Sequence, residues 1–309
     1  MADDVFHAGE IEVQERAGVR AVAAELGERA VAPQLDVNFA VFLRDQYLLI
    51  AGGRDGDGRV WASPLLGQRG FARTEGPGTL ILHTLFAPGD PLGDALDAGA
   101  VKVGLLALDA MSRSRIRVNG LARRTSASIE LEIAETFGNC PKYIQRRTPV
   151  ELLNEGEPGT QTTTGAALDE AQRALVQAAD TFYIATAHPD RGADTSHRGG
   201  RPGFIAVSDD GARVTWPDYQ GNNMFMTLGN LTADPRAGLL FVDWQTGTTF
   251  QLSGRATIDW DDADRIARWP RAKRLIDLEI DALVERPNAI PLRWELVEYS
   301  KVSPPPPAA

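Results

Sequence analysis

The strongest constraint on the fold is an internal repeat. Roughly 133 residues separate two copies of one pattern, and a fixed spacing of this kind indicates a repeated structural unit. Residues 61–71, which contain SPLLGQRGF, match residues 194–204, which contain SHRGGRPGF, at a serine, two glycines and a phenylalanine. Residues 104–122 match residues 238–256 at two leucines, two glycines, an aspartate and an alanine. The chain is therefore predicted to be a tandem duplication.

Each copy is predicted to contain the same series of short elements. The series is a strand, a second strand ending in the glycine-rich frame, a third strand, a short helix, a hairpin and a last strand. Outside the glycine-rich frames, the predicted strands are residues 47–53, 79–84, 103–110, 115–124 and 128–135 in the first copy, and 182–188, 212–218, 237–244, 249–258 and 291–302 in the second. Short strands at this spacing, with turn signals between them, favour an antiparallel barrel.

Helices are predicted in three places. Residues 10–26 form an amphipathic helix, residues 169–179 lead into the second copy, and residues 261–283 are helical on both sides of a break at Pro270. The predicted division of the chain is 1–153 (helix and first copy, with a degenerate site), 154–168 (linker), 169–303 (second copy, with the main site) and 304–309 (disordered proline-rich tail).

Composition excludes several classes of function. The net charge of −10 argues against a nucleic-acid or anionic-membrane binder, which needs a basic face. The single cysteine, Cys140, excludes an intrachain disulfide or a cysteine-rich metal site, and the four histidines lie far apart, so no metal is expected. The start has no signal-peptide pattern, and no run approaches the roughly 18 apolar residues of a membrane span. A cytoplasmic protein is expected.

Three stretches together resemble a known family. They are FHAGEIEVQERAGV (residues 6–19), FGNCPKYIQRR (137–147), and SHRGGRPGF followed by VTWPDYQGNNMFMTLGNLTADPRAGLLFVDW (214–244). In this order they resemble the pyridoxamine 5′-phosphate oxidase-like FMN-binding split barrels, and especially a two-copy branch of flavin-nucleotide-binding proteins, over about residues 5–302. The resemblance implies a mainly β, α+β fold. Two tandem split barrels with N-terminal and C-terminal helices would pack as an intrachain pseudo-dimer, with FMN in the groove between them.

The second copy carries side chains suited to an FMN phosphate. Arg198 and Arg201 supply guanidinium forks, Gly199 allows close backbone approach, and Ser196 adds a hydroxyl. Further candidates are Asn222 and Asn223 at the predicted start of the short helix, where N–H groups favour an anion, and the aromatic rings of Trp216 and Tyr219. The resemblance places flavin contacts on Ser196, His197, Arg198, residues 216–219 (including Asp218), Asn222 and Asn223. The alternative for this stretch is a turn with solvated arginines, and His197 is either a structural or flavin-adjacent side chain or a catalytic base.

The segment 137–147 has two readings. Lys142, Tyr143 and Arg146 reach across to the flavin or to an anionic substrate, or they form a solvated basic helix with Cys140 half buried. The first copy lacks the site chemistry, because Pro64, Leu65 and Leu66 stand where the second has His197, Arg198 and Gly199. One FMN per chain is therefore expected.

The leading functional prediction is an FMN-dependent oxidoreductase acting on a small molecule. No G-x-G-x-x-G fingerprint is present, so NAD(P)H would bind only transiently as reductant. The alternatives are a non-catalytic flavin carrier and a pyridoxamine or pyridoxine 5′-phosphate oxidase. Asn222 and Asn223 stand where the oxidases have a lysine, which weighs against the last alternative. Association of two chains into a homodimer is left open.

Overall fold

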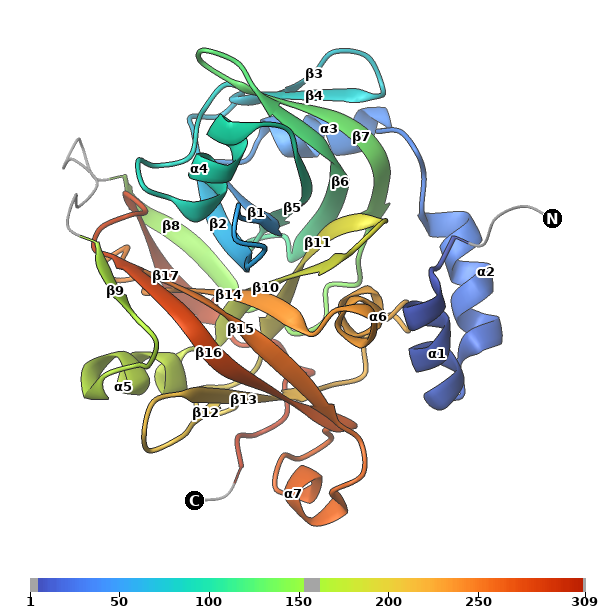
Figure 1. Ribbon diagram of the computed structural model, residues 1–309, viewed down its shortest axis with the longest axis vertical. Coiled ribbons are helices and arrows are strands. Elements are labelled where there is room, and N and C mark those ends of the chain that lie inside the picture. Colours follow the sequence, from blue (N-terminus) through green and yellow to red (C-terminus); the bar gives the residue numbers. More distant parts are fainter. Residues whose placement is uncertain (1–4, 153–161, 308–309) are drawn as a thin grey trace.

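The computed structural model describes residues 5–152 and 162–307, and these form two antiparallel sheets (Figure 1). The first sheet has the order β2 (Val60–Leu66), β1 (Leu48–Arg54), β5 (Val101–Asp109), β6 (Ser114–Arg124), β7 (Ile129–Gly138), β4 (Thr79–Leu82) and β3 (Ala72–Thr74). The second has the order β11 (Gly192–Gly199), β10 (Thr181–His188), β14 (Arg236–Val242), β15 (Thr249–Asp259), β16 (Arg274–Arg286), β13 (Arg213–Asp218) and β12 (Ala206–Val207), and β9 (Thr163–Gly165) pairs with β16. The predicted mainly β fold is confirmed, and strand pairing leaves both sheets open.

The two sheets use the same strand order. Each strand of the first sheet has a counterpart at the same place in the second, and each sheet has a bulge beside an equivalent glycine, Gly120 or Gly254. A helix lies between equivalent strands in both halves, namely α4 (Pro91–Ala98) and α6 (Met226–Ala233). This correspondence agrees with the repeat in the sequence, and a common origin by duplication stays a prediction.

The two sheets approach each other backbone to backbone. A Cβ atom added at Gly104 of β5 would lie 2.6 Å from the carbonyl oxygen of Ala193, and one added at Gly238 of β14 would lie 2.6 Å from that of Val60. Apolar side chains from both sheets, including Ile50, form a shared core around this contact. These glycines occupy equivalent places in the repeat, so the same requirement for close approach occurs on both sides of the interface.

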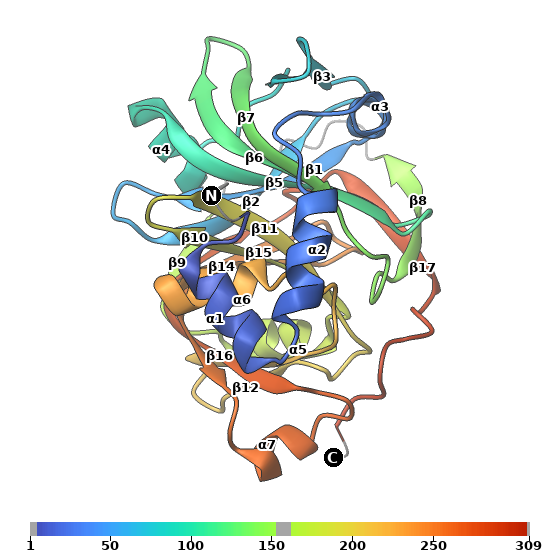
Figure 2. The same cartoon turned by 90° about the vertical axis from the view of Figure 1, so that its right-hand side faces the viewer.

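The N-terminal helix is broken. Residues 10–26 were predicted to be one helix, but the chain forms α1 (Ala8–Arg16) and α2 (Arg20–Ala30). Gly18, with φ of 71°, reverses the direction between them. Figure 2 shows this pair alongside α6. The sequence reading did not identify α3 (Val37–Arg44), whereas the helix at 169–179 is confirmed as α5 (Glu170–Ala178).

Within residues 261–283, residues 274–283 form a strand, so the helical prediction after Pro270 was wrong. Only α7 (Ala263–Ala267) is helical, and β16 begins shortly after Pro270. In β16, the buried residues Ile276, Leu278 and Ile280 alternate with acidic ones, which is the period of two that a strand shows. The predicted last strand, 291–302, is β17 (Leu292–Glu298), which pairs with β8 (Arg146–Leu152) in a separate ribbon. Segment 137–147 is likewise not a helix.

The predicted linker and tail are described only in part. The linker 154–168 lies partly outside the described residues, and its described part contains β9. In the described part of the tail, Pro304 is buried, Pro305 and Pro306 are exposed, and Pro306 lies 3.2 Å from where a Cβ of Gly203 would be. The domain boundaries and the disordered tail stay predictions. Among the helices of the described chain, none has the length and apolarity needed to cross a membrane.

We expect Gly104→Ala to lower the free energy of unfolding by about 1–3 kcal/mol, because its methyl group would displace the backbone of the facing sheet. The matched control is Gly78→Ala, since a Cβ there meets nothing within 4 Å. Urea unfolding of both variants measures the difference. Equal stability of the two variants would contradict the close approach of the sheets.

Candidate functional site

The glycine-rich frame folds into the same turn in both halves. Gly70 and Gly203 have φ of 89° and 88°, and a Cβ at Gly67 or Gly200 would lie 2.3 Å from the ring of the following phenylalanine. The glycines thus allow the turn and the packing of the ring. A Cβ at Gly199 would lie 2.1 Å from the carbonyl oxygen of Tyr143. The close approach predicted at Gly199 is therefore made by the chain itself, not by a ligand.

A small cavity of about 60 Å³ brings together residues that the sequence assigned to phosphate binding. Its walls come from β11, from the segment between β13 and α6, from the start of α6, and from one strand of the first sheet, β6. Its lining includes Arg117, Ser196, Arg198, Asp218, Tyr219, Asn222 and Asn223. The volume is far below the roughly 300 Å³ or more of a site for a whole cofactor, and it suits a group of the size of phosphate.

Guanidinium groups from both halves converge on this cavity. Arg117 of β6 is buried, and its Nη1 donates to Asp194 of β11 at 2.9 and 3.1 Å. Arg274 of β16 lies with its Nε 3.2 Å from Asp218 Oδ2. Arg198, in contrast, has no side-chain hydrogen bond within the described part of the chain. Burial lowers the pKa of Arg198, and the nearby Asp218 counteracts this shift.

Positively charged groups and donors without a partner in the described chain lie at or near the small cavity. Arg115 of β6 donates to the carbonyl oxygen of Cys140 at 2.9 Å, and burial, with Arg117 and Arg198 beside it, lowers its pKa. The hydroxyl of Tyr219 and the Nε atoms of Arg115 and Arg117 are buried and have no partner in the parts of the chain described. Buried polar groups are normally satisfied. Tyr219 and Arg117 line the cavity and Arg115 does not, so the unpartnered groups of Tyr219 and Arg117 are the ones that could donate to a negatively charged acceptor there.

Several predicted site residues do not line this cavity. Trp216 is 1% exposed and packs edge-on against Phe182 in the core of the second sheet, so its predicted contact with a flavin is not available. Arg201 is exposed, with its guanidinium over the ring of Tyr299. Lys142 and Arg146 are half-buried and likewise lie outside the lining. Of the 137–147 candidates, only Tyr143 supports the wall of the cavity.

Tyr143 and the asparagines shape the loop around the cavity. The ring of Tyr143 lies 5.4 Å from that of Tyr219, and its hydroxyl donates to the carbonyl oxygen of Gln220 at 3.1 Å. Asn222 and Asn223 line the cavity but precede α6, which begins at Met226 with no side-chain cap. The expected helix start at the asparagines is therefore corrected, and an anion here would meet loop groups.

The equivalent place in the first half is closed by the chain itself. Ser63, the counterpart of Ser196, donates to Asp90 Oδ1 at 2.8 Å. Gln251 of β15 donates to Ser63 Oγ at 2.8 Å and to Asp90 Oδ2 at 3.2 Å. In the repeat, Gln251 takes the place of Arg117. A neutral amide thus fills one site, whereas a guanidinium lines the other.

Sequence reasoning missed Arg115 and Arg117, although a signal for them exists. In SRIRVNG, Ile116 and Val118 are buried in the core of the first sheet. Because side chains alternate across a strand, both arginines must then point to the opposite face, toward the second sheet. Two cations at alternate positions of an otherwise apolar strand indicate a cluster of charge at an interface.

Helix α1 contacts α6 and the loop that precedes it, which lines the small cavity. Gly9 of α1 meets Gly229 of α6 so closely that a Cβ at Gly9 would lie 2.4 Å from the Gly229 carbonyl oxygen, and Gln14 donates to the carbonyl oxygen of Met224 at 2.9 Å. Burial raises the pKa of Glu10 to about 8 and lowers that of His7 to about 4. Both groups are thus neutral near pH 7.

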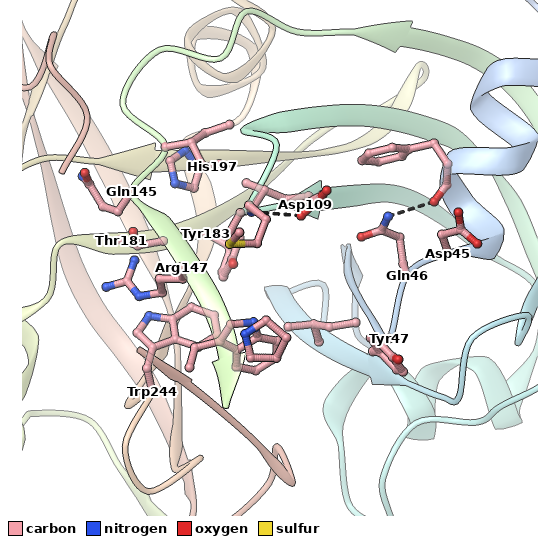
Figure 3. A pocket seen from close by; sticks show the side chains of 18 of the residues that line it. Asp45, Gln46, Tyr47, Asp109, Gln145, Arg147, Thr181, Tyr183, His197 and Trp244 are labelled. Atoms are coloured by element: carbon pink, nitrogen blue, oxygen red, sulfur yellow. Dashed lines mark hydrogen bonds between the residues drawn. The ribbon is translucent and has the colours of Figure 1, made fainter. Parts of the chain in front are cut away.

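His197 faces a second, larger cavity of about 340 Å³. Figure 3 shows it near Thr181 and Arg147 on one side, with Asp45, Gln46 and Tyr47 on the other. Its ring Nδ1 lies 3.2 Å from Nη1 of Arg115. Adjacent residues of a strand point to opposite faces, so His197 is turned away from the small cavity that Ser196 and Arg198 line.

Residues 168–298 match the family model described as pyridoxamine 5′-phosphate oxidase. The family resemblance of this half of the chain is confirmed. No curated protein matches the chain. The match covers β10–β17, and therefore the strand and loop that carry Ser196, Arg198, Tyr219 and Asn222.

Solved structures offer only distant likenesses. One is a candidate pyridoxamine 5′-phosphate oxidase from Lactobacillus delbrueckii, with 16% identity, coverage of 41% of this chain and 98% of that chain, and a TM-score of 0.33. Another is HupZ from Group A Streptococcus, with 15% identity, coverage of 38% and 91%, and a TM-score of 0.31. A third is an FAD binding protein from Mycobacterium smegmatis, with 14% identity, coverage of 41% and 98%, and a TM-score of 0.27. Likeness at this level carries no weight for function.

Replacing Glu10 should change the pH dependence of stability. The folded-state pKa of Glu10, about 8, lies above its unfolded value of 4.5, so wild-type stability falls as pH rises between these values, by at most about 1.4 kcal/mol per pH unit. Glu10→Gln removes this loss, and its stability relative to wild type should increase from pH 6.5 to pH 8. Urea unfolding at both values measures the trend, and parallel pH profiles would refute it.

Proposed function

We propose that the chain binds one FMN and acts as an FMN-dependent oxidoreductase on a small molecule. The observation that carries the proposal is the guanidinium of Arg198. It is partnerless within the described residues and faces a phosphate-sized cavity that also contains Arg117 from the other half. The family match of residues 168–298 supports the same assignment.

The residues present fit the phosphate of FMN. A phosphate dianion needs several donors and a compensating positive charge. Arg198 and Arg117 supply charge, and the unpartnered hydroxyl of Tyr219 supplies a donor. Asp218 and Asp194 reduce the repulsion among the guanidinium groups, since Asp218 pairs with Arg274 and Asp194 pairs with Arg117. The remaining donors favour an anion.

The proposal includes one site per chain, in a pair of tandem split barrels packed as a pseudo-dimer. The shared strand order of the two sheets supports the tandem arrangement. The hydrogen bonds among Ser63, Asp90 and Gln251 support a single site, because they occupy the place where a second phosphate would bind.

Bound FMN would supply hydride or electron transfer on its isoalloxazine ring. The protein would hold the cofactor by its phosphate through Arg198, Arg117 and Tyr219. Tyr143, packed against Tyr219, and Gln14, bonded to Met224, would keep the loop in place and limit the access of water. No side chain is assigned as a general acid or base.

Replacing Arg198 by alanine should weaken FMN binding by about 10- to 100-fold, the usual cost of losing a charged hydrogen bond. Arg201→Ala is the matched control, because Arg201 belongs to the same turn but is exposed and outside the cavity. Fluorescence titration with FMN gives both affinities and a stoichiometry expected near one. Similar FMN affinities in the two variants would mean that the phosphate does not bind at Arg198.

A reduction assay separates the oxidoreductase from its rivals. The FMN-loaded protein is mixed without oxygen with NADPH or NADH, and flavin absorbance is followed. Rapid bleaching supports an oxidoreductase, whereas stable colour with every reductant supports a flavin carrier. Turnover of pyridoxamine 5′-phosphate with oxygen would support an oxidase of that substrate.

A further inference from the structure

The larger cavity has the build of a separate small-molecule site. Its volume, about 340 Å³, lies within the range of ligand pockets. It forms where the two sheets meet the β8–β17 ribbon, and residues of all three parts line it. It shares no lining residue with the small cavity, so it is argued independently of the proposed FMN site.

Aromatic side chains form its walls. The rings of Trp244 and Trp294 both line the cavity and meet edge to face at 5.0 Å, and the guanidinium of Arg147 lies over the ring of Trp244 at 5.4 Å. Tyr47 lies on another side of the cavity, with the guanidinium of Arg69 over its ring at 5.1 Å (Figure 3). Walls of this kind favour a planar aromatic ligand.

One wall carries two unused polar groups. Tyr183 and His197 are directly paired across β10 and β11, and Thr181 and Gly199 are the next pair on the same face, so Thr181, Tyr183 and His197 point the same way. Thr181 is 5% exposed, and its hydroxyl has no hydrogen-bond partner in the described ranges 5–152 and 162–307. A buried hydroxyl of this kind is costly unless something fills the cavity.

The imidazole of His197 adds a donor beside that hydroxyl. Arginine can only donate, so Nδ1 accepts from Arg115 Nη1, and the proton of the neutral ring is on Nε2. Burial, with Arg115, Arg198, Arg147 and Arg117 nearby, holds the pKa of His197 well below its usual value. The ring is therefore a neutral donor in surroundings that favour an anion.

Two of the charged side chains that line the cavity are engaged within the protein. Arg147 pairs with Asp180 through two contacts of 2.6 Å. Asp109 accepts from the backbone N–H of Met111 and from the hydroxyl of Ser112. On the wall formed by β10 and β11, the hydroxyl of Thr181 and the Nε2–H of His197 can both donate to one oxygen-bearing group.

We propose that this cavity binds a planar aromatic carboxylate. The ring lies among Trp244, Trp294 and Tyr47, and the carboxylate accepts hydrogen bonds from Thr181 and His197. A neutral ligand with the same ring would be held less tightly, since it gains less from the surrounding arginines. The cavity is distinct from the phosphate site on the other face of β11.

The test uses 2-naphthoate as probe, with calorimetry on the full chain. Binding of 2-naphthoate is expected to be several-fold tighter than that of 2-naphthamide. Thr181→Val should weaken binding about five- to tenfold through loss of one hydrogen bond, whereas Thr181→Ser, which keeps the hydroxyl, should bind nearly as wild type. Thr249→Val is the control, because Thr249 also has a buried, unpartnered hydroxyl but does not line the cavity.

The same titration is repeated with saturating FMN. Unchanged 2-naphthoate affinity supports a separate site, and displacement by FMN would assign the cavity to the flavin and overturn the proposal. Absence of binding at millimolar 2-naphthoate, or equal affinities of wild type and Thr181→Val, would overturn it as well. The outcome does not depend on whether FMN binds through Arg198, so the two proposals can fail separately.

Discussion

The buried ion pair between Arg117 and Asp194 joins the two halves of the molecule. Arg117 is 6% exposed and Asp194 is 4% exposed, and each belongs to a different sheet. Removing one member of such a pair typically costs about 3–5 kcal/mol, because the other charge is left buried alone. The pair exists only because Gly104 and Gly238 let the sheets approach at backbone distance. The position of the Arg117 charge in the site therefore depends on how closely the two sheets pack.

The same arrangement explains why two similar halves differ in function. An arginine at the β6 position reaches the second half, whereas a glutamine at the equivalent β15 position reaches the first. The glutamine donates to Ser63 and Asp90, so these three side chains fill the equivalent place in the first half. The arginine donates to Asp194 but leaves its own Nε without a partner in the described chain, and it lines the same cavity as Arg198. The substitution between equivalent strands, Gln251 against Arg117, is one of the differences between the closed first half and the proposed site in the second.

Much of the fold and part of the candidate site could be predicted from the sequence, because strand patterns and the internal repeat are visible in the order of residues. Most strands, the helix at Asp169, and the gathering of Ser196, Arg198, Tyr219 and Asn222 follow from order along the chain. The rest depends on tertiary contacts. Trp216 was predicted to contact the flavin, but its side chain is buried in the core of the second sheet. Gly199 was predicted to let the backbone approach a ligand, but the backbone that approaches it is that of Tyr143.

Two incorrect predictions, the helix in place of β16 and the omission of the β6 arginines, could have been avoided from the sequence pattern. The alternation in LIDLEID marks β16 as a strand, where a helix was predicted. The alternation in SRIRVNG places Arg115 and Arg117 on the face opposite Ile116 and Val118. The predicted contribution of the first half was placed after β7 instead, at Lys142, Tyr143 and Arg146. Which face of β6 meets the second sheet is known only once the sheets are packed.

The central claim is that the first half supplies a cation to a site in the second. The most direct test is FMN affinity in a chain carrying both Arg117→Gln and Asp194→Asn, which removes the cation without leaving a buried charge. We expect a loss of affinity of about tenfold or more, with the fold retained, in line with the loss of one charged contact. Wild-type affinity in this folded variant would contradict the account.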